Sequence, residues 1–170
     1  MVRFISFLLL LSCQPISAQD SWKNVYSESA WAERDRWQKA DELIRYLAIQ
    51  RGSQVADVGC HEGYMTVKLA SEVGPQGKVY AVDVEQSKLD RLETILAKRS
   101  LHQVDAIKGD YDNPKLPLNS LDGVIILDAY HEMDSHDEIL QHVKVALKPG
   151  GRLILCEAVA ESRRNSTREE

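Results

Sequence analysis

Hydrophobic and polar residues alternate along residues 38–160 in a way that predicts a regular succession of helices and strands. Short apolar runs predict strands at residues 54–59, 78–83, 103–108, 123–128 and 152–157. Between them, apolar residues three and four positions apart predict helices at residues 43–48, 64–73, 87–99 and 137–147. The run at 123–128 is continuously apolar up to its final aspartate, which is typical of a strand buried on both faces.

Strands that alternate with helices predict one α/β domain built on a parallel sheet. Each strand–helix–strand unit requires a crossover connection, and such crossovers are right-handed. The carboxyl ends of all the strands then meet at one edge of the sheet. Because ligands bind outside that edge in open α/β sheets, the residues at the strand ends are the candidates for function.

An acidic residue falls at or near the end of every predicted strand: Asp57, Asp83, Asp110, Asp128 and Glu157. Such an edge would repel the pyrophosphate of a dinucleotide. It suits a ligand with positive charge, such as S-adenosylmethionine, which has a sulfonium and an ammonium group. Asp83 follows the second strand, where an acid can accept hydrogen bonds from both ribose hydroxyls.

The turn after the first strand contains two glycines, Gly59 and Gly63, and leads into a helix. Glycine lets the backbone approach a ligand closely, and the free N–H groups at a helix start can hold an anion such as a carboxylate. The turn lacks the full G-x-G-x-x-G pattern of dinucleotide-binding folds. A nucleotide-dependent dehydrogenase is therefore the weakest of the alternatives.

The composition of the chain excludes further classes of protein and of site. The chain has 170 residues, which fits one domain, and a formal net charge of −5, which argues against a nucleic-acid binder. Its three cysteines cannot form a disulfide framework, and neither a Cys-x-x-Cys motif nor a Cys/His cluster suggests a metal site.

Three segments in order resemble class I S-adenosylmethionine-dependent methyltransferases. Residues 55–64 are similar to the family's first motif, residues 73–83 to its second-strand region, and residues 147–153 to the turn before its fifth strand. The resemblance covers residues 38–160, and residues 37–43 and 128–133 are most similar to the exported bacterial branch. It implies a doubly wound, Rossmann-like sheet in the order 3-2-1-4-5. The family's sixth and seventh strands are expected to be missing here. In that order the fourth strand separates Cys60 from Cys156, so a disulfide between them is not expected.

The resemblance also assigns roles to individual residues. Gly59 and Gly63 would shape the methionine pocket, and Asp57 would support that loop. Asp83 would bind the ribose. Asp110, beside Tyr111, would face the adenine amine, and Asp128 and Tyr130 would flank the sulfonium and the entering acceptor. His61 stands where the family usually has a third glycine, so its side chain is expected either to crowd the cofactor or to line the acceptor pocket.

The expected reaction is in-line methyl transfer from S-adenosylmethionine to a small-molecule acceptor. Alignment of the two molecules and exclusion of water suffice, with proton removal where the acceptor requires it. His131 is the first candidate for the base, with Tyr130 as a positioning residue; a helix cap or a packing role is the alternative for His131. The Asn-Pro-Pro-Tyr signature of nucleic-acid amino-methyltransferases is absent. A non-catalytic or vestigial cofactor-binding domain is the second hypothesis, and the oligomeric state stays open.

Residues 1–18 have the pattern of a secretory signal, with Arg3 before an apolar run and Ile16-Ser17-Ala18 as a cleavage site. The run is too short to span a membrane. Cys13 offers a competing lipoprotein site and hence a lipid anchor. Export to the cell envelope or the medium is expected, with a cytoplasmic protein and an uncleaved N-terminus as the alternative. Residues 19–37 would form a lead-in segment that packs on the domain, and residues 161–170 a charged tail.

Overall fold

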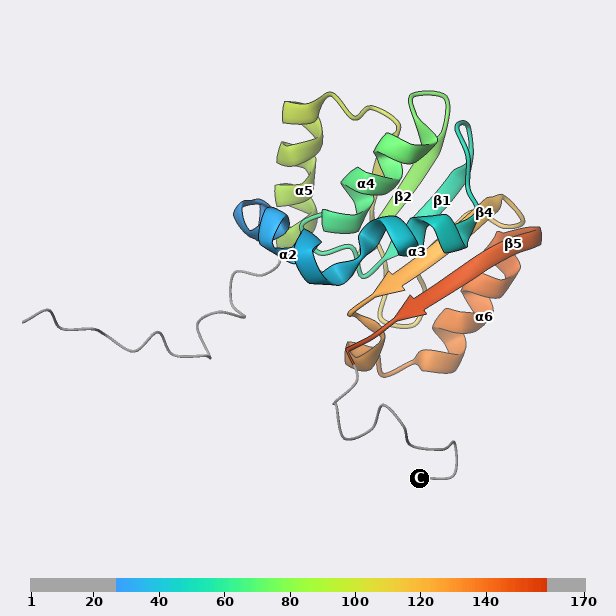
Figure 1. Ribbon diagram of the computed structural model, residues 1–170. Coiled ribbons are helices and arrows are strands. Elements are labelled where there is room, and N and C mark those ends of the chain that lie inside the picture. The colour runs from blue at the N-terminus through green and yellow to red at the C-terminus, as the bar shows by residue number, and fades with distance from the viewer. Residues whose placement is uncertain (1–26, 159–170) are drawn as a thin grey trace, which may run out of the picture.

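Five parallel strands form the central sheet, in the order β3-β2-β1-β4-β5 (Figure 1). This computed structural model describes residues 27–158. The strands are β1 (Gln54–Val58), β2 (Lys78–Asp83), β3 (Val104–Lys108), β4 (Leu121–Leu127) and β5 (Leu147–Cys156). The order and the parallel direction confirm the predicted fold class. The segment 1–18 with Cys13, the start of the lead-in, the tail 161–170 and the question of further strands lie outside the described residues.

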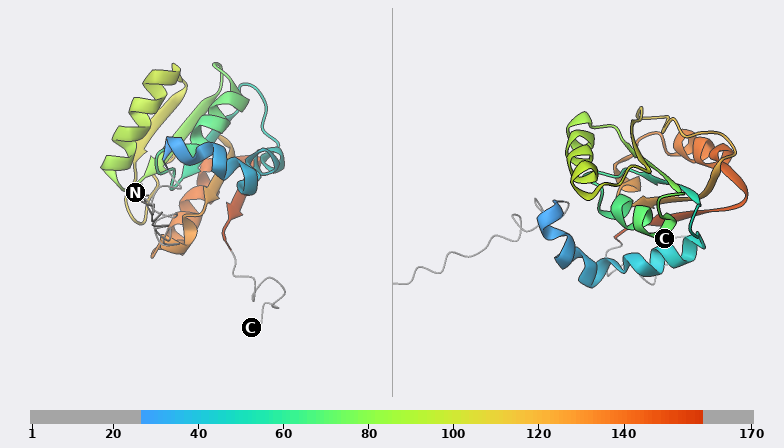
Figure 2. Two further views of the ribbon diagram at one scale, coloured as in Figure 1. Left: turned by 60° about the vertical axis from the view of Figure 1, so that its left-hand side comes forward. Right: turned by 90° about the horizontal axis from the view of Figure 1, so that it is seen from above.

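Helices cover both faces of this sheet (Figures 1 and 2). Helices α3 (Ala40–Leu47), α4 (Tyr64–Val73) and α5 (Gln86–Arg99) pack on one face, and α6 (His136–Ala146) packs on the other. Val124 and Ile126 of β4 face α6, whereas Ile125 and Leu127 face the other layer. All four are buried, which explains the continuous apolar run in the sequence.

Strand β5 begins earlier than the sequence predicts. It starts at Leu147, which pairs with Leu121, and the next regular pair joins Gly123 to Arg152. The residues between, Lys148–Gly151, bulge out of the ladder. Pro149 has no N–H to donate and Gly150 has a φ of 84°, so this turn sequence cannot pair regularly.

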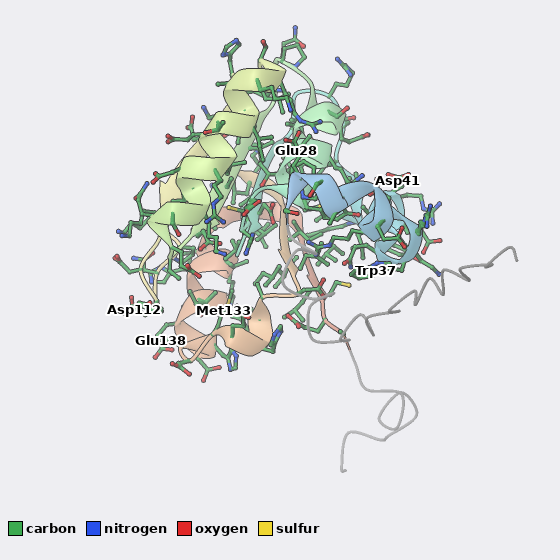
Figure 3. The ribbon with its side chains drawn as sticks, turned by 90° about the vertical axis from the view of Figure 1, so that its left-hand side faces the viewer. Glu28, Trp37, Asp41, Asp112, Met133 and Glu138 are labelled. Carbon is green, nitrogen blue, oxygen red and sulfur yellow. The ribbon has the colours of Figure 1, made fainter. Side chains whose placement is uncertain are left out.

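The end of the lead-in segment is helical, with a 3-10 turn η1 (Glu28–Ala30) followed by α2 (Trp31–Gln38). Trp31, Arg34 and Gln38, at i, i+3 and i+7, are the buried residues of α2 and share one face. Glu28 and Trp37 lie at opposite ends of this segment (Figure 3). A polar helix of this kind is held by specific contacts rather than by an apolar stripe, and those contacts lie at the carboxyl edge of the sheet.

No helix within residues 27–158 is both long enough and apolar enough to cross a membrane.

Candidate functional site

A cavity of about 470 Å³ opens at the carboxyl ends of β1, β2 and β4. Its size is in the range of small-molecule sites, roughly 300–1,000 Å³. Seven of the ten residues predicted for the site line it: Asp57, Gly59, His61, Asp83, Asp110, Tyr111 and Asp128. Gly63, Tyr130 and His131 do not line it. The wall also includes side chains outside that prediction, among them Arg34, Met65, Lys88, Met133 and Ile139.

Asp83, at the end of β2, fixes two loops of the cavity. Its Oδ2 accepts the backbone N–H of His61 at 2.8 Å, and its Oδ1 accepts that of Glu85 at 2.9 Å. The N–H groups of Gly59 and Cys60 both donate to the carbonyl of Val82. The loop after β1 is therefore held against the end of β2. Each carboxylate oxygen has a further lone pair, as the predicted ribose contact requires.

Asp57 is buried beneath the same loop, with 2% of its surface exposed. The Thr66 hydroxyl on α4 donates to its Oδ2 at 2.6 Å. Burial raises the pKa of Asp57 to about 6, and the Thr66 hydrogen bond and the charge of Arg34 oppose that increase. Asp57 thus joins β1 to the start of α4.

The two glycines of the turn meet different neighbours. Gly59 has a φ of 79°, and a Cβ on it would lie 2.4 Å from the Cβ of Ala129 after β4. Gly63 has a φ of 93°, and a Cβ there would lie 2.3 Å from Cδ1 of Leu92 on α5. Gly59 therefore lets the loop pack at the cavity, whereas Gly63 lets α4 start close to α5.

His61 also has a left-handed backbone, with a φ of 50°. Its half-buried side chain lines the cavity near Lys88. Burial is the main cause that lowers the pKa of its imidazole, and the charge of Lys88 acts in the same direction. A neutral ring in the wall fits either of the two expectations for this residue.

The loop after β3 supplies the most exposed part of the wall. Oδ1 of Asp110 forms an ion pair with Nζ of Lys115 at 2.9 Å. The neighbouring side chain, Tyr111, is 78% exposed. Both residues border the cavity where the adenine end of the cofactor is expected.

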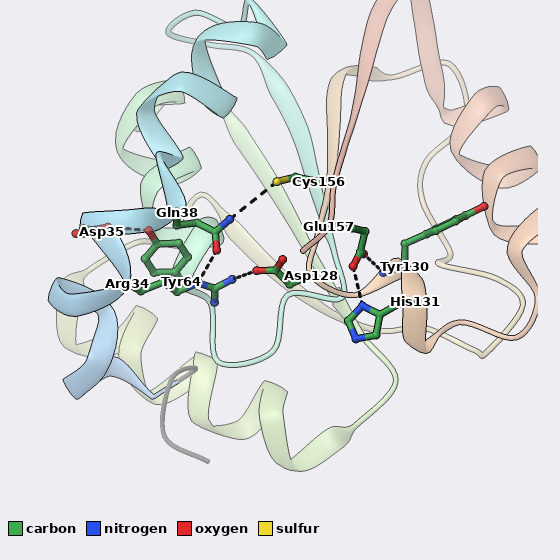
Figure 4. Close-up of polar contacts among 9 residues, drawn as sticks. All are labelled: Arg34, Asp35, Gln38, Tyr64, Asp128, Tyr130, His131, Cys156 and Glu157. Carbon is green, nitrogen blue, oxygen red and sulfur yellow. Dashed lines mark hydrogen bonds and ion pairs between the residues drawn. The ribbon is translucent and has the colours of Figure 1, made fainter. Parts of the chain in front are cut away.

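Arg34 is the most deeply connected of the wall residues that the sequence analysis missed. Its side chain is 4% exposed, and its Nη2 lies 2.9 Å from Oδ2 of Asp128 at the end of β4 (Figure 4). The guanidinium also stacks over Tyr64, 4.3 Å from the ring centroid, and its Nε donates to Gln38. Burial raises the pKa of Asp128, and Arg34 opposes this increase. Helix α2 thus delivers a cation to a cavity rich in carboxylates.

Tyr130 and His131 belong to a 3-10 turn, η2 (Tyr130–Glu132), beside the cavity. The Tyr130 ring stacks on His136 of α6, with 4.2 Å between centroids. The His131 ring is 59% exposed, and its Nδ1 lies 2.7 Å from Oε2 of Glu157. Their neighbours Asp128, Ala129, Glu132 and Met133 form part of the cavity wall.

The side chains of the cavity fit S-adenosylmethionine. Asp83 can accept hydrogen bonds from a ribose, the carboxylates of Asp57 and Asp128 favour a cationic sulfonium and ammonium, and Arg34 can hold a carboxylate. Between residues 27 and 158, no cluster of three or more His, Cys, Asp or Glu side chains is arranged to hold a metal ion.

Comparison with known proteins identifies relatives of the chain. Residues 49–169 match the family model described as a methyltransferase domain. The demethylmenaquinone methyltransferase of Geobacillus stearothermophilus is 32% identical over 122 residues, which are 72% of this chain and 51% of that protein. That of Listeria monocytogenes is 30% identical over 118 residues, 69% of this chain and 49% of that protein. The chain therefore spans about half the length of the curated relatives it matches.

Solved structures agree with this result. A SAM-dependent methyltransferase from Aquifex aeolicus superposes with a TM-score of 0.68 at 26% identity, over 75% of this chain and 68% of that one. Coclaurine N-methyltransferase has a TM-score of 0.62 at 22% identity, over 69% of this chain and 34% of that one, a likeness of fold alone. The chain thus belongs to the methyltransferase-domain family and has the fold of class I S-adenosylmethionine-dependent methyltransferases.

Proposed function

We propose that this chain binds S-adenosylmethionine at the carboxyl edge of the sheet and transfers its methyl group to a small-molecule acceptor. One observation carries the proposal: a single cavity of about 470 Å³ is bordered by Asp83 on one side and by the Arg34–Asp128 pair on the other. Ribose, sulfonium and carboxylate groups each find a complementary partner there. The family of the chain supports the same cofactor.

The apolar side chains of the cavity wall indicate the chemical class of the methyl acceptor. Met65, Met133 and Ile139 line the cavity with flexible or branched apolar surface. The formal charge of −5 does not favour a nucleic acid. The similar proteins of Geobacillus and Listeria are named for demethylmenaquinone, a small molecule. We infer a small, mainly apolar acceptor.

The residues of the chain have three tasks in such a reaction. When bound, S-adenosylmethionine supplies an already activated methyl group, so the chain needs to align the acceptor in line with it and exclude water. Asp83 would hold the ribose of the cofactor, Arg34 would hold its carboxylate, and α2 would cover it. Tyr130 would position the acceptor, and His131 would take up a proton from a hydroxyl or an amine.

Calorimetric titration of the full chain with S-adenosylmethionine and with NAD tests the first step. We expect binding of the former alone, and binding of NAD alone would overturn the proposal. Methyl transfer is then measured as S-adenosylhomocysteine formed with reduced short-chain demethylmenaquinone, with a catechol and with a primary amine. Binding without transfer to any acceptor would favour a domain that binds the cofactor without catalysis.

A further inference from the structure

Glu157 joins the end of β5 to the turn after β4. One carboxylate oxygen, Oε1, accepts the backbone N–H of Tyr130 at 2.6 Å, and the other, Oε2, lies 2.7 Å from Nδ1 of His131 (Figure 4). The Glu157 side chain is 18% exposed, whereas the His131 ring is 59% exposed. A largely buried acid thus holds both the backbone and the imidazole of the η2 turn.

This contact selects one form of the His131 ring. An ionised carboxylate can only accept hydrogen bonds, so Nδ1 must carry the proton that it shares with Glu157. In the neutral ring Nε2 is then the atom with the free lone pair. The nearest acid to Nε2 is Glu132, whose Oε1 lies 3.9 Å away, beyond hydrogen-bond distance. Nε2 is therefore able to receive a proton from another molecule.

The pair of Glu157 and His131 lies at the border of the cavity rather than remote from it. Both residues act electrostatically on Asp128, which lines the cavity: the charge of Glu157 raises the pKa of Asp128, and His131 lowers it. Residues 128, 129 and 133, which flank the η2 turn, and Glu132 within it are all part of the wall. His131, whose ring is 59% exposed, therefore stands in the chain between wall residues Ala129 and Glu132.

We propose that Glu157 is a positioning residue for methyl transfer, which orients His131 so that Nε2 accepts a proton from a hydroxyl or amine acceptor. The inference rests on the proposed function and adds to it the residue that fixes the orientation and the tautomer of the base, His131. The proton of the acceptor moves to Nε2, and the acceptor lone pair forms the bond to the methyl carbon. The carbon–sulfur bond breaks, and S-adenosylhomocysteine leaves with the electron pair. Glu157 balances the charge of the imidazolium, which then loses its proton to solvent at its exposed side.

The substitution Glu157→Gln tests the role of the carboxylate at nearly constant size. The amide oxygen can still accept the N–H of Tyr130, but the amide NH₂ then faces Nδ1 of His131 as a donor. Nδ1 of the neutral ring must then accept that hydrogen bond, so the ring proton moves to Nε2. Nε2 thereby loses the free lone pair that the reaction needs. We therefore expect a change of tautomer, without a change of fold.

Two readouts follow that change in the full chain. With ¹⁵N-labelled histidine, NMR should show His131 as the Nδ1–H tautomer in the wild type and as the Nε2–H tautomer in Glu157→Gln; His131→Asn identifies the signal. With a catechol as acceptor, whose hydroxyl would lose its proton to Nε2, we expect kcat to fall at least tenfold, while the Kd of S-adenosylmethionine stays within twofold. The matched control Glu132→Gln removes the other neighbouring carboxylate and should leave the tautomer unchanged.

The possible results separate this inference from the proposed function. An unchanged tautomer, or an unchanged kcat in Glu157→Gln while the wild type transfers methyl groups, overturns the role of Glu157 and leaves the function standing. Failure of the wild type to transfer a methyl group to any acceptor overturns the proposed function itself, and the role of Glu157 in catalysis with it.

Discussion

At the scale of single residues, Asp57 links the protonation of a buried acid to stability. Its folded-state pKa of about 6 lies above the ordinary value of 3.8, because burial disfavours the carboxylate. The protonated form therefore contributes stability below pH 3.8, and this contribution is lost as the pH rises through 6. Asn at this position stays neutral and can still accept the Thr66 hydroxyl.

We expect Asp57→Asn to be more stable than the wild type at pH 8, by up to about 3 kcal/mol for a shift of this size. The difference should shrink between pH 6 and pH 4. Urea unfolding followed by far-ultraviolet circular dichroism, repeated at each pH, measures it. A difference that is constant over this range would show that Asp57 is ionised in the folded protein throughout.

Asp83 is the residue on which the cofactor proposal depends most directly. In Asp83→Asn the charge is lost, and one amide hydrogen must face the N–H of His61 or of Glu85, both of which the carboxylate accepts. Loss of charge-assisted hydrogen bonds, about 1.5–3 kcal/mol, predicts at least tenfold weaker binding of S-adenosylmethionine by calorimetry.

The control for Asp83 is Asp105→Asn on the neighbouring strand β3. Asp105 is 50% exposed and pairs with Lys78, away from the cavity wall. The affinity of Asp105→Asn for S-adenosylmethionine should stay within twofold of that of the wild type. If Asp83→Asn behaves in the same way, Asp83 does not bind the cofactor.

The sequence located four acids of the site but neither of its two cations, Arg34 and Lys88. Asp57, Asp83, Asp110 and Asp128 were predictable because each lies at or near the end of a strand, and parallel strands end at one edge. Arg34 lies in a polar segment whose position depends on tertiary contacts that the sequence does not display. The available signal was spacing: Trp31, Arg34 and Gln38 fall on one helix face, and an arginine on a buried face requires a partner.

At the scale of elements, α2 is a polar helix that Arg34 fastens to the sheet. Removal of its guanidinium leaves Asp128 without the partner that lowers its pKa, and that pKa rises further. We expect Arg34→Met to lower the free energy of unfolding by roughly 2 kcal/mol at pH 8. The loss should be smaller at low pH, where protonated Asp128 no longer needs the ion pair.

Tryptophan fluorescence reports the same change. Trp31 is 8% exposed and packs against Tyr64, so release of α2 in Arg34→Met should move the emission to longer wavelength. Arg36→Met is the matched control, because Arg36 is 75% exposed on the same helix and forms an ion pair with the exposed Glu33. Such a pair is worth about 0–1 kcal/mol, so neither stability nor emission should change appreciably. Equal effects of the two substitutions would exclude Arg34 as the residue that docks α2.

The elements themselves were largely predictable, for a physical reason. Strands β1 and β4 are largely buried, mostly apolar runs, β2 has buried apolar residues at alternate positions, and α4 and α5 have apolar stripes, so local pattern and tertiary position agree. The start of β5 was not predictable, because Lys148–Gly151 reads as a turn and joins the strand only through the pairing of Leu147 with Leu121. Helix α2 was not predictable either, since it has no apolar stripe.

At the scale of the whole molecule, the placement of the charge is more informative than its sum. The formal net charge of −5 is modest, yet four of the five strand-end acids line one cavity, where only Arg34 and Lys88 are cationic among the described lining residues. A charge distribution of this kind attracts a cation over several ångströms, and dissolved salt screens that attraction.

S-adenosylmethionine has one more positive charge than S-adenosylhomocysteine, and the two molecules are otherwise nearly the same. The Debye length falls from about 10 Å at 0.1 M salt to about 3 Å at 1 M. Calorimetry at these two salt concentrations should therefore show that the Kd of S-adenosylmethionine rises at least threefold more than that of S-adenosylhomocysteine. Glu132→Gln, which removes an acid of the wall, should reduce this difference, whereas Glu93→Gln on the exposed face of α5 should not. Equal salt dependence of the two ligands would mean that the acids of the sheet edge act on the fold and on the neutral parts of the cofactor, and not on its sulfonium charge.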